Sequence, residues 1–161
     1  MDMNQIGNEK DSTQLFQNVY IERCDKETEN FISEEVISFL EQPISYLKKN
    51  NKEYVYIEVD SLEAVRTDGI TMEVDDVFGT FNMMIGLKLV KKKEAQIKQY
   101  LDANLKGEGL KYAMLFNQQD GLWDLNFMLD FVEGFNENMK FSEAILTVQQ
   151  FLSQLVEAVN N

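Results

Sequence analysis

The strongest constraint on the fold of this chain is a pair of neighbouring segments in which every second residue is apolar. The first covers residues 110–116 and the second covers residues 123–131. A period of two places alternate side chains on opposite faces of a β-strand, and Gln119-Asp120-Gly121 between the segments is a turn sequence. We therefore predict a long hairpin whose second strand buries Trp123 in the core.

The same alternation predicts further strands upstream. Residues 54–59 alternate Val and Ile with Tyr and Glu, and residues 81–90 alternate apolar residues around Gly86, which marks a bulge or a close backbone approach. The turn dipeptide Asp68-Gly69 separates residues 65–67 from residues 70–74, which predicts a second hairpin. We thus expect a mostly antiparallel sheet of about five strands.

Three segments instead carry apolar residues at steps of three and four, the spacing of one helix face. Residues 29–47 predict a helix that is capped by Thr28 and kinks or restarts at Pro43. Residues 92–106 predict a second helix, ended by Gly107. The third helix begins at Ser142, whose hydroxyl is expected to cap it, and runs nearly to the end of the chain. Residues 13–24 fit either a helix or a strand, and their spacing leaves both open.

This order of elements is helix, three strands, helix, two strands, helix, and it predicts an α+β fold with helices packed on one face of a twisted sheet. We expect a flexible tail at residues 1–12 and a single domain over residues 13–161. The element order, size, acidity and amphipathic C-terminal helix resemble the type III secretion chaperone-like fold and the related bacterial sensory transduction regulator proteins. In that family the chaperones are homodimers that hold an extended segment of another protein. No sequence motif is matched, so no residue role is carried over.

The formal charge is strongly negative, with 15 Lys and Arg against 28 Asp and Glu, a net charge of -13. Such a charge repels phosphates, so nucleic acid and anionic membranes are poor partners. No apolar run approaches the length that spans a bilayer, and the N-terminus lacks the basic and apolar regions of a signal peptide. Cys24 is the only cysteine, so no intrachain disulfide forms, and we expect a cytoplasmic protein.

The motifs of common enzymes and metal sites are missing from the sequence. There is no His, which removes Ser-His-Asp triads, His-metal sites and the usual general base near neutral pH. Acidic neighbours of Cys24 disfavour its thiolate, and Gly107-Glu108-Gly109 lacks the Lys and the helix of a phosphate loop. Asp68-Gly69 and Asp120-Gly121 do not fit calcium loops, because no carboxylate occupies the first ligand position. We predict no cofactor and no metal.

Two charged segments remain as candidate sites. The densest acidic cluster could support carboxylate or metal chemistry if Glu58 and Glu73 converge from adjacent strands, although a solvated sheet face explains it more simply. Its members are Glu58, Asp60, Glu63, Asp68, Glu73, Asp75 and Asp76. The basic run Lys91 to Lys93 is interpreted as a solvated junction between a strand and a helix.

Our leading hypothesis is a non-enzymatic protein-binding module, such as a chaperone, adaptor or inhibitor, that acts through an apolar groove and an acidic surface. The alternative is a small-molecule-binding or sensory domain with a pocket between sheet and helices, and a carboxylate enzyme comes third. A two-fold homodimer is the default assembly, tightened by moderate salt. The expected partner-binding residues are Met83, Ile85, Leu152, Leu155 and Val159.

Overall fold

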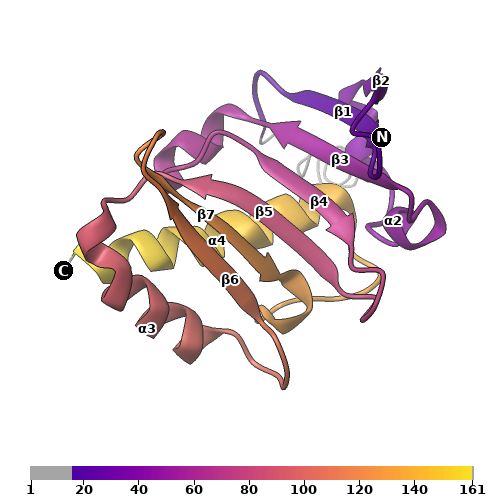
Figure 1. Cartoon of the computed structure of the whole chain (residues 1–161). Helices are drawn as coiled ribbons and strands as arrows, with labels where there is room; N and C mark the ends of the chain where they lie inside the picture. The colour runs from indigo at the N-terminus through magenta and orange to yellow at the C-terminus, as the bar shows by residue number, and fades with distance from the viewer. Residues whose placement is uncertain (1–15, 161) are drawn as a thin grey trace, which may run out of the picture.

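The structure is a computed structural model that describes residues 16–160, and it is built on one open antiparallel sheet. Seven strands form the sheet in the order β2-β1-β3-β4-β5-β7-β6 (Figure 1). Their bounds are β1 Tyr20–Asp25, β2 Phe31–Glu35, β3 Glu53–Glu58, β4 Ile70–Val74, β5 Phe81–Leu87, β6 Tyr112–Asn117 and β7 Leu122–Met128. The α+β class is confirmed, but the sheet has seven strands rather than about five. The expected tail at residues 1–12 lies outside the described residues.

Helices cover one face of this sheet. The 20-residue α4 (Phe141–Asn160) crosses behind the strands in Figure 1, and α3 (Glu94–Asn104) packs alongside it through the rings of Tyr100 and Phe151. The remaining elements are short: α2 Tyr46–Lys49, η1 Ile37–Glu41, η2 Asp60–Val65, η3 Lys91–Lys93 and η4 Leu129–Phe131. No helix among residues 16–160 has the length and apolar character needed to cross a membrane.

The register of the strands separates an apolar face from a polar face. One row of paired residues faces the helices and consists of Ser33, Arg23, Val55, Met72, Met83, Phe127 and Tyr112. The next row faces away from them and consists of Glu34, Glu22, Tyr56, Thr71, Met84, Asn126 and Ala113. Because successive side chains of a strand alternate between faces, the predicted period of two is what makes the sheet one-sided. Trp123 lies on the helix-facing side and is 3% exposed, as predicted.

The helix predicted over residues 29–47 is wrong. This segment forms β2, η1 and α2 instead, and Thr28 lies in a turn rather than at a helix N-cap. Ile32 and Val36, which were expected on a buried helix face, are 43% and 72% exposed. Pairing with β1 gives residues 31–35 backbone hydrogen bonds to a neighbouring strand, and this tertiary gain outweighs the local helical spacing. β1 also settles the ambiguity of residues 13–24 from Tyr20 onward, as a strand.

Three smaller predictions at element ends need correction. Residues 65–67 do not form a strand, because η2 occupies residues 60–65 and β4 pairs with β3 and β5. Gly86 pairs with Asp124 in regular register, so it marks no bulge. Ser142 does not cap α4: its buried hydroxyl has no hydrogen-bond partner within residues 16–160, and the Glu143 carboxylate accepts a hydrogen bond from the Lys140 amide instead.

The tight hairpin turns share one geometry in which the fifth residue adopts a left-handed conformation. In the turns that begin at Asp75 and Asn117 this residue is glycine, with φ of 69° at Gly79 and 68° at Gly121. In the turn that begins at Asp25 it is Glu29, with φ of 63°. A residue with a Cβ is strained in this region, so the β1–β2 turn is less stable than its two counterparts.

We predict that Glu29→Gly stabilises the protein by roughly 0.5–1 kcal/mol, because relief of the left-handed strain exceeds the added flexibility of the unfolded chain. The matched control is Gly79→Ala, whose new Cβ meets nothing within 4 Å and thus reports the backbone cost alone. It should destabilise by about 1 kcal/mol. Urea denaturation measures both, and destabilisation by Glu29→Gly would show that the Glu29 side chain contributes a contact.

Candidate functional site

The five residues expected to bind a partner lie in the core. Met83 and Ile85 of β5 face the helices, and all five are between 0% and 6% exposed. Leu152, Leu155 and Val159 are the helix side of the same packing layer. The apolar stripe of α4 packs against the apolar face of the sheet, so neither surface is exposed for binding another chain. The candidate surface must therefore be sought elsewhere.

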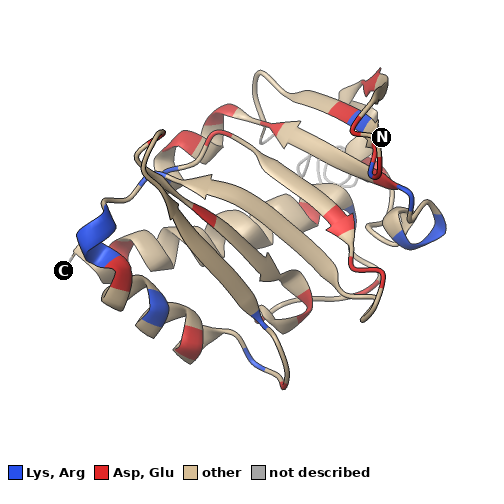
Figure 2. Ribbon diagram, in the orientation of Figure 1, with Lys and Arg blue, Asp and Glu red and all other residues tan. Residues whose placement is uncertain are grey.

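The face of the sheet that points away from α4 carries many polar side chains, and no helix of residues 16–160 covers it (Figure 1). We call it the open face. Its carboxylates lie on five strands and are Glu34, Glu22, Glu58, Glu73 and Asp124. Figure 2 shows these acidic positions on the strands, whereas lysines gather on α2 and at the start of α3. The strands thus give the open face an acidic character, although Lys26 and Lys88 lie at its margins and pair with Asp76 and Asp68.

The negative charge is concentrated where β2, β1 and β3 meet. Glu34 of β2 lies directly opposite Glu22 of β1, and Glu58 of β3 lies opposite Tyr20. Within residues 16–160, none of the three glutamates pairs with a Lys or Arg. Like charges on opposite positions of neighbouring strands destabilise a sheet. This arrangement therefore costs stability in the isolated protein.

Tyrosine hydroxyls solvate part of this charge. Tyr20 donates a hydrogen bond to Glu22 over 2.5 Å, and Tyr56 donates one to Glu58 over 2.5 Å. The Glu22 carboxylate raises the pKa of Tyr20 to about 12. Burial and the Glu58 carboxylate likewise raise the pKa of Tyr56, so both hydroxyls remain protonated donors at neutral pH. Glu34 receives no hydrogen bond from residues 16–160 and is exposed.

The acidic cluster expected to converge is dispersed. β3 and β4 are neighbours, but their antiparallel register places Glu58 and Glu73 at opposite ends, four residues or about 13 Å apart. Asp68 pairs with Lys88, Asp76 pairs with Lys26, and Asp75 accepts amide hydrogen bonds within its own turn. Residues 16–160 contain no group of three Cys, Asp or Glu side chains placed to hold a metal ion.

A hollow of about 350 Å³ lies in the middle of the open face. Gly69 makes room for the ring of Tyr56, since a Cβ there would lie 2.5 Å from the tyrosine oxygen. Gly86 provides a floor without a side chain between Met84 and Asp124. An apolar floor with carboxylates at its rim can accept the stem and the charged end of a long cationic side chain.

A second hollow of about 340 Å³ lies toward the β1–β2 turn and contains Glu73. Burial raises the pKa of Glu73, and Asp75 and Asp76 add to that effect, while Lys26 opposes it. Lys26 is held by the Val74 carbonyl at 2.5 Å and by Asp76 at 3.0 Å. Cys24 is buried nearby, and burial together with Glu22 raises the pKa of its thiol, while a hydrogen bond with Tyr54 opposes this rise.

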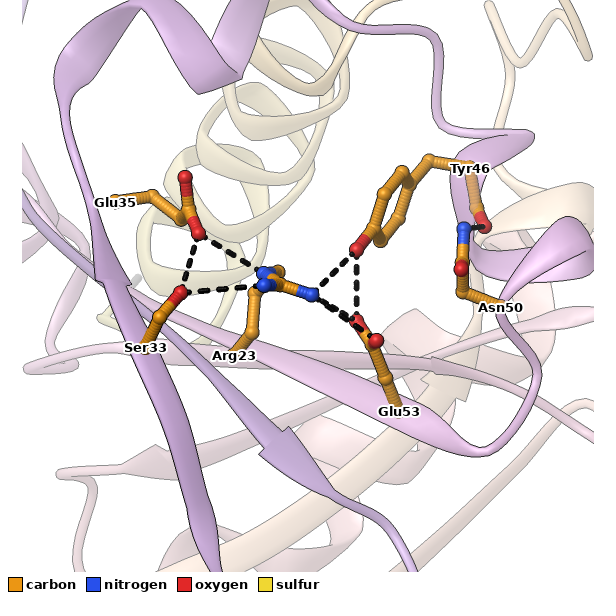
Figure 3. Close-up of polar contacts among 6 residues, drawn as sticks. All are labelled: Arg23, Ser33, Glu35, Tyr46, Asn50 and Glu53. Atoms are coloured by element: carbon orange, nitrogen blue, oxygen red, sulfur yellow. Dashed lines mark hydrogen bonds and ion pairs between the residues drawn. The ribbon is translucent and has the colours of Figure 1, made fainter.

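Arg23 fixes the acidic edge of the sheet from the helix-facing side (Figure 3). Its guanidinium donates to Glu35 of β2 at 2.9 Å and to Glu53 of β3 at 3.0 Å. It also donates to the Ser33 hydroxyl and to the Tyr46 hydroxyl of α2. The Ser33 hydroxyl and Arg23 together hold the pKa of Glu35 below its usual range. A planar guanidinium with several carboxylate partners resists displacement, so β2 is held firmly at the sheet edge.

Sequence reasoning missed the apolar side chains that remain exposed along this edge. Phe31 and Ile32 of β2 are 59% and 43% exposed, and Val36 and Ile37, which follow it, are 72% and 41% exposed. The helical spacing of residues 29–47 hid the signal, because it assigned these residues to a buried face. The basic run Lys91 to Lys93 does form a strand-to-helix junction, as predicted, with Lys93 donating to the Val159 carbonyl.

No protein-family model, curated protein or solved structure matches this chain. The resemblance to type III secretion chaperones therefore remains a prediction from the order of elements. The function must be inferred from the geometry of the open face itself.

We predict that Glu73→Gln raises the thermal unfolding midpoint at pH 7, because it removes the cost of holding a buried carboxylate in its charged form. The folded-state pKa of Glu73 is raised, so wild type regains this stability as the pH falls through that pKa. The difference between variant and wild type should therefore narrow toward pH 4. Thermal melts from pH 4 to 8 measure this difference in unfolding midpoint, and Glu108→Gln, at an exposed position, is the control. If the difference does not change with pH, the charge of buried Glu73 is not its cause.

Proposed function

We propose that this protein is a non-enzymatic protein-binding module whose open face receives a basic region of another protein. The observation that carries the proposal is the cross-strand pair Glu22 and Glu34, joined by Glu58 on the next strand, with no cation from residues 16–160 beside them. Repulsion between these carboxylates destabilises the free protein, and a cationic partner relieves that repulsion when it binds. The chaperone, adaptor and inhibitor roles expected from sequence are all compatible with such a surface.

The charge of the whole chain supports the same partner. A net charge of -13 attracts basic proteins over long range and raises their association rate at low salt. The larger hollow on the open face then offers a place for an individual cationic side chain, with Met84 in its lining and the carboxylates of Asp68 and Asp124 beside it. Long-range attraction and local fit thus favour the same class of partner.

A buried small-molecule site between sheet and helices is less well supported. In the described residues that layer is filled by side chains such as Met83, Phe127 and Leu152, each fully buried. A hollow of about 340 Å³ lies between α3 and α4, next to Gln150 and Gln154, and not beneath the sheet. The homodimer also remains a prediction, since the residues on which it was based belong to the core.

The proposal predicts that reversing the acidic edge of the open face abolishes capture of a basic protein from cell extract. The test variant combines Glu22→Lys, Glu34→Lys and Glu58→Lys, and the control combines Glu108→Lys, Glu133→Lys and Glu157→Lys, which are exposed and outside the open face. Both triples change the net charge equally. Captured protein, once identified by mass spectrometry and purified, should bind the test variant about a hundredfold more weakly than wild type.

The control triple should lose much less affinity, and circular dichroism must show that both variants are folded. Equal losses in the two variants would mean that net charge alone causes the binding. A partner that binds the test variant as tightly as wild type, or an enzymatic activity that depends on open-face carboxylates, would overturn the proposal.

A further inference from the structure

The edge of the sheet at β2 is a short strand without the Lys and Pro residues that often prevent strand addition. An outer strand presents unpaired backbone groups, and proteins commonly protect such edges with Lys, Pro or an inward-pointing charge. Residues 31–37 read Phe-Ile-Ser-Glu-Glu-Val-Ile and contain neither Lys nor Pro. Their inward charge, Glu35, is neutralised by Arg23 instead of guarding the edge. Within residues 16–160, β2 thus ends the sheet as an ordered strand that no further strand pairs with.

The side chains of β2 on the open face define what an added strand must carry. Glu34 lies opposite Glu22, and Phe31 lies opposite Cys24 across a bulge, so both point to the open face. Val36 follows Glu34 by two residues and is 72% exposed. The edge therefore presents an acidic position between apolar positions, because Phe31 and Ile32 flank it on one side and Val36 on the other. Cross-strand pairs of opposite charge and of apolar residues stabilise neighbouring strands.

We propose that β2 binds an extended segment of the partner as an eighth strand, with a Lys or Arg opposite Glu34 and apolar residues on both sides of it. This inference rests on the proposed function and adds the binding mode and the sequence pattern of the partner. Neighbouring strands lie about 4.8 Å apart, so the cation contacts Glu34 directly and Glu22 lies one strand further in. The two unpaired carboxylates then share one positive charge.

Charge distinguishes this occupant from a second copy of the chain. Two copies paired through β2 would bring Glu34 of both chains to one edge, on molecules that each carry a net charge of -13. That repulsion opposes self-pairing, whereas a basic segment removes it. The other outer strand, β6, exposes Ala113 and Leu115 but carries no charged residue, so it offers no comparable selection for a cation.

A random peptide library of twelve residues, displayed on phage and selected on the full-length wild-type protein, tests the proposal. Enriched peptides should contain a Lys or Arg flanked by apolar residues. As synthetic peptides they should bind about tenfold more weakly to Glu34→Lys and to Val36→Lys, but equally well to the control Leu115→Lys on β6. Glu34→Gln serves as a milder variant should Glu34→Lys fold poorly.

Hydrogen exchange locates the peptide on the protein. Binding should slow exchange of the β2 amides, Phe31–Glu35, and leave those of β6, Tyr112–Asn117, unchanged. Failure to enrich any peptide, protection of β6 instead, or a dimer in sedimentation equilibrium that protects β2 would overturn the proposal. A different result would overturn strand addition but not the proposed function. In that case the peptides would no longer bind when Glu22 and Glu58 are replaced by Lys, yet binding to wild type would not slow exchange of the β2 amides.

Discussion

The packing of α4 across only one face of the sheet is the constraint on which the rest of this structure depends. The helix is 20 residues long, and its buried stripe includes Ile145, Val148, Leu152 and Leu155. These residues share one core cluster with apolar residues of every strand except β2, so most of the large apolar side chains are used in one layer. Burial of apolar area supplies the main driving force for folding, and it acts here on one side of the sheet. The side chains of the open face are therefore not constrained by core packing, and solubility and binding can determine which residues occur there.

The edge of the sheet depends on a second, polar interaction. β2 buries little apolar surface, and all of its residues are at least partly exposed. Arg23 compensates by joining Glu35, Glu53, Ser33 and Tyr46 into one hydrogen-bonded group that ties β2 to β1, β3 and α2 (Figure 3). A network in which each charge has partners specifies geometry more than it adds stability. The strand is therefore held in position without being covered.

These two constraints together explain why the acidic edge can serve binding. The one-sided core leaves the open face uncovered, and the Arg23 network orders its outermost strand before any partner arrives. An ordered strand loses little conformational entropy when a further strand pairs with it, so more of the interaction free energy appears as affinity. The uncompensated pair of Glu22 and Glu34 gives this edge its preference for a cation. The β2 edge thus combines an ordered backbone with a negative charge that favours a cationic partner.

The sequence by itself determined the strands with strict alternation, the last helix, the burial of Trp123 and the acidity of the surface. In each of these the local pattern and the tertiary environment agree, because a period of two or of three to four directly sets which face is buried. Tertiary structure alone decided residues 29–47, where helical spacing lost to strand pairing with β1, a contact that no local pattern contains. It also decided that Glu58 and Glu73 separate while Glu22 and Glu34 meet, because antiparallel register, and not distance along the chain, determines which carboxylates become neighbours.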